Sequence, residues 1–71
     1  MGSKYPVLKT SNVIRRLKKH GFVFKSQKGS HSKYTMSSKT VIIPMHGEVA
    51  KGTLQSILEQ AGLTLNEFLN I

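Results

Sequence analysis

The stretch "FVFKSQKGSHSKYTMSSKTVIIP", residues 22–44, decides the fold. Three runs within it, 22–27, 31–36 and 40–44, are rich in aromatic, β-branched and threonine residues and have the composition of strands. The segments "KGS" and "SSK" between them consist of residues that favour turns. Because such short links join antiparallel neighbours, the stretch predicts a three-stranded antiparallel meander that ends at Pro44.

The middle run, "HSKYTM", predicts which side chains share a face of the sheet. Successive residues of a strand point to opposite faces, so His31 and Lys33 should lie on one face and Tyr34 on the other. We therefore interpret Tyr34 as a core or sheet-packing residue rather than a platform for stacking nucleobases.

Apolar residues at helical spacing flank the meander on both sides. A first helix is predicted to begin at Thr10 or Ser11, which both favour the N-cap position, and to end before Gly21. A second helix is predicted over about 53–61, where apolar residues recur at the spacing of a core-facing stripe. Next, "TLNEFLN" begins with a capping box, which predicts a short closing helix.

The resulting order, α-β-β-β-α, predicts a two-layer α+β domain. Its three-stranded antiparallel sheet would carry both main helices on one face and leave the other face open. Double-stranded-RNA-binding domains use this order of elements, although order alone does not define a function. We expect residues 1–9 to form an irregular N-terminal arm and residues 10–71 to form a single domain.

The charge balance is one-sided. The 71 residues include 11 Lys and Arg but only 3 Asp and Glu, which gives a net charge of +8. Such a field attracts nucleic acid, an anionic membrane surface or an acidic protein, and nucleic acid is favoured. The chain has no cysteine and no apolar run long enough to cross a membrane. We expect a cytoplasmic protein without a membrane partner.

The scarcity of acidic residues limits the chemistry that the chain can perform. The sequence contains no Asp, so a Ser-His-Asp relay is excluded, and three scattered glutamates offer no carboxylate pair or metal cage. The three histidines have no metal-ligand spacing either. The pattern predicts no metal and no cofactor. Histidine acid–base chemistry on RNA remains, because the 2′-hydroxyl of RNA is a built-in nucleophile and lysines can stabilise charge on the phosphate.

His31 is the first candidate for that chemistry. It follows a glycine turn, where a phosphate can approach, and Lys28 and Lys33 are its neighbours in sequence. An exposed strand histidine in a basic patch explains the same pattern equally well. His20 falls at the end of the first predicted helix, where a histidine usually caps. His46, between Pro44 and Gly47, is either a second catalytic or RNA-contacting group or a solvated loop residue.

Other residues near these histidines are candidates for binding RNA. Ser30 either contacts a phosphate or serves the turn. Lys51 stands beside the start of the second predicted helix, whose N-terminus attracts anions. The candidate RNA-binding residues are Lys28, Ser30, Lys33, His46 and Lys51.

Three segments together resemble one family. "LKKHGFVF", "KGSHSKY" and "VIIPMHGEVAKGTLQSILEQAGLTLNEF" follow each other in the order and spacing of the HicA toxins, also called YcfA-like proteins. These are small bacterial mRNA interferases of type II toxin–antitoxin systems, and the resemblance spans roughly residues 11 to 69. The specific parts are "GSH" followed by Tyr34, the "PMH" of residues 44–46, and "KGTLQSIL" with "QAGL" after it.

The resemblance implies a function that composition does not show. The fold would be of the double-stranded-RNA-binding type, and the activity would be cleavage of mRNA that arrests translation. The catalytic histidine of the family falls on His31. The implied partner is a HicB-type antitoxin that covers the active site. A catalytic role for His46 does not follow from the resemblance. A non-catalytic RNA-binding module of the same fold and an interaction domain for an acidic partner remain as alternatives.

Overall fold

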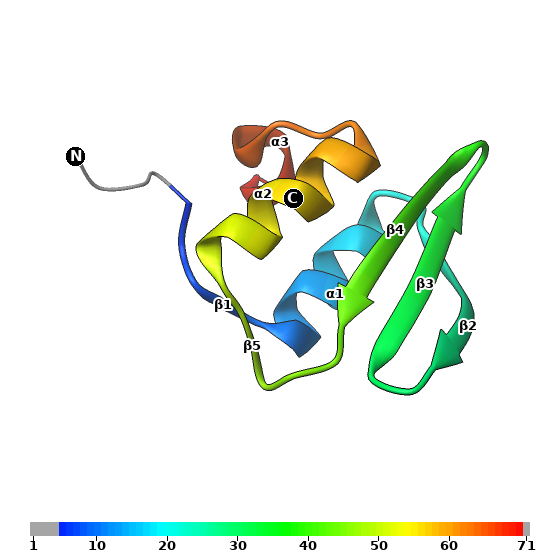
Figure 1. Cartoon of the computed structure of the whole chain (residues 1–71). Coiled ribbons are helices and arrows are strands. Elements are labelled where there is room, and N and C mark those ends of the chain that lie inside the picture. The colour runs from blue at the N-terminus through cyan, green and yellow to red at the C-terminus, as the bar shows by residue number, and fades with distance from the viewer. Residues whose placement is uncertain (1–4, 71) are drawn as a thin grey trace.

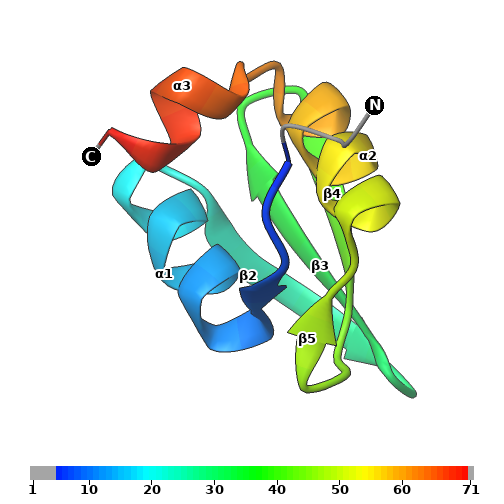
Figure 2. The same cartoon turned by 90° about the vertical axis from the view of Figure 1, so that its left-hand side faces the viewer.

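The computed structural model of the chain describes residues 5–70 and has the predicted α+β architecture (Figure 1). A three-stranded antiparallel sheet lies on one side, and the helices lie on the other (Figures 1 and 2). The elements are β1 (Leu8–Lys9), α1 (Thr10–Lys19), β2 (Val23–Lys28), β3 (His31–Met36), β4 (Lys39–Pro44), β5 (Glu48–Val49), α2 (Lys51–Ala61) and α3 (Leu65–Leu69).

The sheet has the order β2-β3-β4 that a meander of short links requires. Its two faces differ as the alternation in β3 predicted. Ser32 and Tyr34 are buried on the face toward the helices, whereas His31 is exposed on the opposite, open face. The prediction that His31 and Lys33 share a face is therefore confirmed.

The core lies between the sheet and the helices. It is built from α1, the inner face of β3 and β4, α2 and α3, which explains why three short helices are stable on so small a chain. The buried apolar residues are Val13, Leu17, Phe22, Tyr34, Val41, Ile43, Val49, Leu54, Ile57, Leu58, Ala61 and Phe68.

The N-terminal arm is shorter than predicted. Leu8 and Lys9 are not irregular but form β1, which pairs antiparallel with β5 through Leu8↔Val49 and Lys9↔Glu48. Residues 5–7 precede this pairing, and the part of the predicted arm over residues 1–4 lies outside the described residues. Strands of two residues are too short to show an alternating pattern, so this small second sheet was not predicted.

The predicted start of α1 at Thr10 is confirmed, but the predicted cap is wrong. Lys9 takes the N-cap position without a side-chain hydrogen bond. Helix α2 begins at Lys51 rather than near residue 53, so Gly52 lies inside its first turn. The capping box of Thr64 and Glu67 at α3 is confirmed by both of its hydrogen bonds.

The two phenylalanines near β2 differ in burial. Phe22 precedes β2 and is buried in the core. Phe24 lies on β2, an edge strand that the helices do not cover, and 53% of its surface is exposed. It packs edge-on against Tyr34, with ring centroids 5.7 Å apart. A bulge between Phe24 and Ser26 then shifts the register of the strand.

Candidate active site

The open face of the sheet brings His31 between two neighbours. Lys28 on β2 pairs directly with His31, and Pro44 on β4 pairs with it from the other side. Cross-strand partners project from the same face about 4.5–5.5 Å apart at Cβ. The next row, Ser26–Lys33–Ile42, adds a second lysine. His31 is therefore an exposed imidazole with one lysine beside it and another two residues further along its own strand.

The turn before His31 depends on the conformation of Gly29 and on the hydrogen bonds of the Gln27 side chain. Lys28 and His31 pair across a two-residue turn, in which Gly29 has a φ of +58°, a left-handed conformation that glycine adopts without strain. The Gln27 side-chain amide donates to the Gly29 carbonyl oxygen (3.1 Å), and the buried Ser32 hydroxyl donates to Gln27 Oε1 (3.2 Å). These bonds fix the start of β3, and hence the backbone of His31.

The loop that carries His46 adjoins this turn. The Met45 backbone N–H donates to the Ser30 carbonyl oxygen at 2.6 Å, which extends the β3–β4 ladder one step beyond Pro44. The Thr10 hydroxyl donates to the His46 carbonyl oxygen, and the Thr10 N–H donates to the Gly47 carbonyl oxygen (3.2 Å). The structure thus brings Lys28, Ser30, His31 and His46 to one end of the sheet.

Lys51 is placed apart from this group. It is the first residue of α2 and follows β5 in the chain, whereas the other candidates belong to β2, β3 or the loop after β4. Its exposed ammonium lies at the helix end where anions are favoured. A contact with RNA at Lys51 therefore needs a strand that extends past the His46 loop.

His20 has the structural position that the sequence predicted. It is the C-cap of α1, and its backbone N–H donates to carbonyl groups of the last turn. Its ring Nε2 donates to the Glu67 carbonyl oxygen at 3.1 Å, which ties α1 to α3. Hydrogen bonds from Thr64 hold the pKa of the Glu67 carboxyl below its usual range, and the nearby His20 and Lys39 lower that pKa further. His20 therefore belongs to the helix packing and not to the open face.

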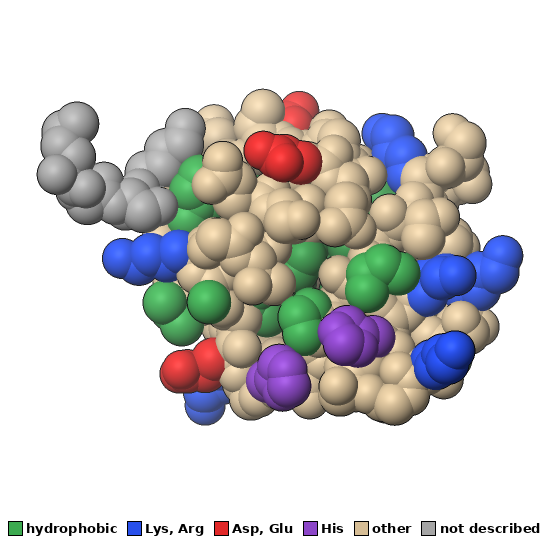
Figure 3. All heavy atoms as spheres, in the orientation of Figure 1, with side chains coloured by type: hydrophobic (Ala, Val, Ile, Leu, Met, Phe, Trp, Pro, Cys, Tyr) green, Lys and Arg blue, Asp and Glu red, His purple; other side chains and the backbone are tan. Residues whose placement is uncertain are grey.

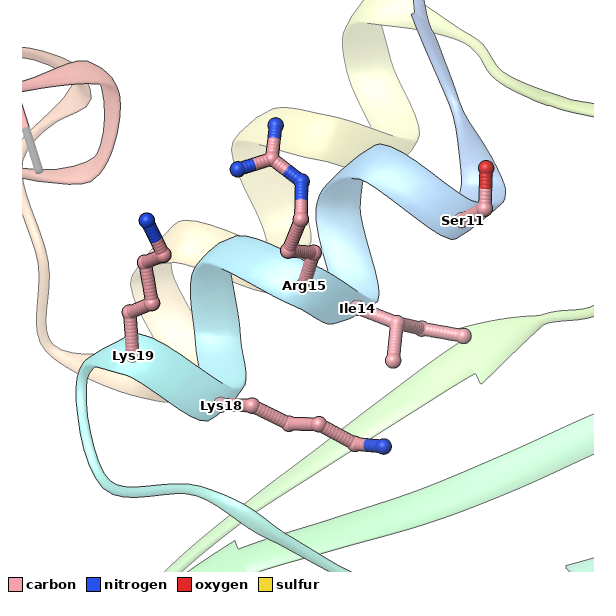
Figure 4. A pocket seen from close by; sticks show the side chains of 5 residues that line it. All are labelled: Ser11, Ile14, Arg15, Lys18 and Lys19. Atoms are coloured by element: carbon pink, nitrogen blue, oxygen red, sulfur yellow. The ribbon is translucent and has the colours of Figure 1, made fainter.

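A second cationic region runs along α1, where a hollow of about 530 Å³ opens on the helix surface. Arg15 and Lys19 project to one side of it, and Ile14 and Lys18 project to another (Figure 4). Arg16, in the same basic run, does not line the hollow. Its guanidinium donates to the side chain of Asn12 and to the carbonyl oxygen of Leu69 at 2.8 Å. Arg16 is thus engaged inside the fold.

The side chains that ligate metals are dispersed. Within residues 5–70, no group of three or more His, Cys, Asp and Glu residues stands close enough to hold a metal ion. Over the same residues, no helix is long and apolar enough to cross a membrane.

Some features of the site were missed from the sequence, although one could have been found. A two-residue turn between "K" and "H" in "KGSH" requires Lys28 to pair with His31, so this pairing follows from the spacing. The contact of Thr10 with His46 could not be found in this way, because the two residues are 36 positions apart in the sequence and Thr10 had a local role as a candidate N-cap.

Together, the exposed histidine, the lysines on an open sheet face and the strand order define a small basic α+β domain with the element order of double-stranded-RNA-binding domains. Comparison with known proteins then identifies the family. Residues 10–63 match the family described as "HicA toxin of bacterial toxin-antitoxin". The "Probable mRNA interferase HicA" of Pseudomonas fluorescens (strain Pf0-1) is 40% identical over 58 residues, which cover 79% of this chain and 97% of that relative. The chain belongs to the HicA toxin family.

Proposed function

We propose that this chain is the toxin of a type II toxin–antitoxin pair and an endoribonuclease that cleaves single-stranded mRNA without a metal ion. The observation that carries the proposal is the row Lys28–His31–Pro44, which presents one imidazole beside an ammonium on an otherwise open sheet face. Family membership and the name of the Pseudomonas relative, an mRNA interferase, support the same activity. The cytoplasm, where mRNA is translated, is the proposed location.

The proposed reaction uses the RNA strand's own nucleophile. The 2′-hydroxyl oxygen attacks the adjacent phosphorus, the bond from phosphorus to the 5′-oxygen breaks, and a 2′,3′-cyclic phosphate and a 5′-hydroxyl end are left. His31 acts as a general acid or base in this transfer, a role that typically contributes roughly 10²–10⁴-fold to a rate. The Lys28 ammonium beside it stabilises the negative charge that builds on the phosphate.

The other candidates are proposed to hold the RNA strand. Lys28 and Lys33 project from the same face as His31, so they are placed to pair with successive phosphates. Ser30 and His46 border the turn at which the phosphate enters, and Lys51 contacts the strand further along.

The proposed partner is a HicB-type antitoxin that covers the face with His31. Exposed apolar side chains on and beside that face, Val23, Ile42 and Met45, give a protein partner surface to bury, and the surrounding lysines favour an acidic one. A complex in which His31 stays accessible and RNA is still cut would contradict direct occlusion.

Incubation of the purified protein with single-stranded RNA in excess EDTA tests the proposed activity. We expect shortening of the RNA to persist in chelator and to be lost in His31→Ala. Activity that disappears with EDTA and returns with magnesium would overturn the metal-free mechanism. RNA that is bound but never cut would assign the chain to the non-catalytic RNA-binding modules.

A further inference from the structure

His31 and His46 belong to backbone segments that lie next to each other at the end of the sheet. His31 pairs with Pro44 across β3 and β4, and the Met45 N–H donates to the Ser30 carbonyl oxygen at 2.6 Å. His46 is the next residue of that loop. The ladder therefore brings residue 46 to the same end of the sheet as residue 31, although 14 residues separate them in sequence.

The chain after β4 keeps His46 near this end of the sheet. Ile43 points inward and is buried, and Pro44, the last residue of β4, projects from the open face with His31. The chain bends at His46, two residues beyond Pro44. Both histidines are exposed. Figure 3 shows histidine side chains close to one another on one face of the molecule, with hydrophobic side chains beside them.

The backbone of His46 is fixed by a residue from another part of the fold. Thr10, only 5% exposed, donates its hydroxyl to the His46 carbonyl oxygen and its N–H to the Gly47 carbonyl oxygen. The pairing of Lys9 with Glu48 holds the same segments together immediately beside this contact. Loop histidines are usually mobile and solvated, so a buried anchor at this position is a specific arrangement. It holds the loop at a set place relative to His31.

We infer that His46 is the second catalytic group of this site and that His31 and His46 act as an acid–base pair on the RNA phosphate. This inference rests on the proposed ribonuclease activity and deepens it. One imidazole, neutral, takes the proton of the attacking 2′-hydroxyl. The other, protonated, gives its proton to the departing 5′-oxygen. One proton is taken and one is given, so the charge on the pair is unchanged after cleavage.

The pair predicts a bell-shaped dependence of the cleavage rate on pH, because one histidine must be neutral while the other is charged. Several charged groups bear on the two rings. Lys28 and Lys33 share the face of His31, Glu48 on β5 and Lys9 on β1 border the loop of His46, and Lys51 follows further along the chain at the start of α2. The prediction concerns the presence of two limbs in the pH profile.

The test compares His46→Ala, His31→Ala and the double variant with the parent protein on one single-stranded RNA. His20→Ala is the matched control, because its ring contacts the Glu67 carbonyl and not the open face. We expect each of the two site variants to lose roughly 10²-fold or more in single-turnover rate and the double variant to lose little beyond the worse of them. Each single variant should also lose one limb of the pH profile. His46→Gln repeats the measurement with a side chain of similar bulk, and circular dichroism sets the folded concentrations.

A second substrate separates the acid from the base. In RNA with sulfur in place of the bridging 5′-oxygen, the leaving thiolate needs no proton. We expect that substrate to restore the rate of one of the two single variants and not of the other. If His46→Ala and His46→Gln cut as fast as the parent while His31→Ala is inactive, the pair is overturned and the proposed function stands. If His31→Ala also cuts at the parental rate, the proposed function itself fails.

Thr10 is a positioning residue on this account. Thr10→Val removes the hydroxyl that holds the His46 carbonyl, whereas Thr10→Ser keeps it. We expect Thr10→Val to cut more slowly with both pH limbs retained, and Thr10→Ser to recover most of the rate. Equal rates for the two variants at matched folded concentration would show that the anchor does not support the pair.

Discussion

The sheet end around His31 and the hollow along α1 are both cationic, but they differ in what their side chains can do. The first holds imidazoles, which exchange protons near neutral pH, next to lysines that attract phosphate. The second is lined by the cations Arg15, Lys18 and Lys19 together with Ser11 and the apolar side chain of Ile14, and it contains no imidazole. Net charge alone therefore predicts two surfaces for an anionic partner, and only the chemistry of the side chains separates a site of reaction from a site of attachment.

The largest expected difference between the two regions is in rate. His31→Ala should reduce RNA cleavage and toxicity by roughly 10²–10⁴-fold, the contribution of a general acid or base. Arg15→Ala should leave the rate at saturating RNA unchanged. Single-turnover cleavage by both variants, at folded concentrations set by circular dichroism, measures the difference. If His31→Ala cleaves RNA at the rate of the parent protein, the sheet end around His31 is not the site of reaction.

The second expected difference is in RNA affinity near the cleavage site. Lys28→Ala and Lys33→Ala should each weaken binding of a short single-stranded RNA and lower the slope of log affinity against log salt by about 0.7, the value for one phosphate contact. Lys39→Ala is the matched control, since Lys39 pairs with Met36 at the opposite end of the β3–β4 ladder from His31. Slopes that move equally in all three variants would indicate a general charge effect rather than contacts.

A smaller effect is expected from the hollow on α1. Arg15→Ala combined with Lys19→Ala should weaken binding of a long RNA by about threefold, because exposed single charges contribute little each. The rate at saturating RNA should not change. Titration of a long and a short RNA against the double variant checks this. A larger loss on the short RNA than in Lys28→Ala would place the main RNA contact on α1.

Local chemistry allowed much of the fold to be predicted, and long-range contacts account for what was missed. Turn residues predict the meander, and the alternation of side chains along β3 predicts the face of His31. The spacing of Thr64 and Glu67 predicts the capping box of α3. The β1–β5 pair could not be predicted in this way, since two strands of two residues carry no periodic signal. The anchoring of His46 by Thr10 depends on how α1 packs against the loop, and no spacing in the sequence encodes it.

The last expected effect is on stability alone, and it distinguishes Arg15 from Arg16, two adjacent arginines of α1 that local sequence patterns do not tell apart. Arg16 donates to the Leu69 carbonyl oxygen at 2.8 Å and to Asn12 Oδ1 at 3.0 Å, so it ties α1 to the end of α3, beside the buried Phe68. Arg15 is exposed and donates only to the Asn12 side chain among the bonds found in residues 5–70.

Arg16→Ala should therefore cost about 1 kcal/mol of stability, the net value of such a half-buried hydrogen bond, and lower the melting temperature by about 4–8 °C. Arg15→Ala removes the same charge and should leave the melting temperature nearly unchanged. Thermal unfolding followed by circular dichroism compares the two variants at one salt concentration. Equal melting temperatures would mean that the contact with α3 contributes no net stability, and Arg16 would then count, with Arg15, as a cation available to RNA.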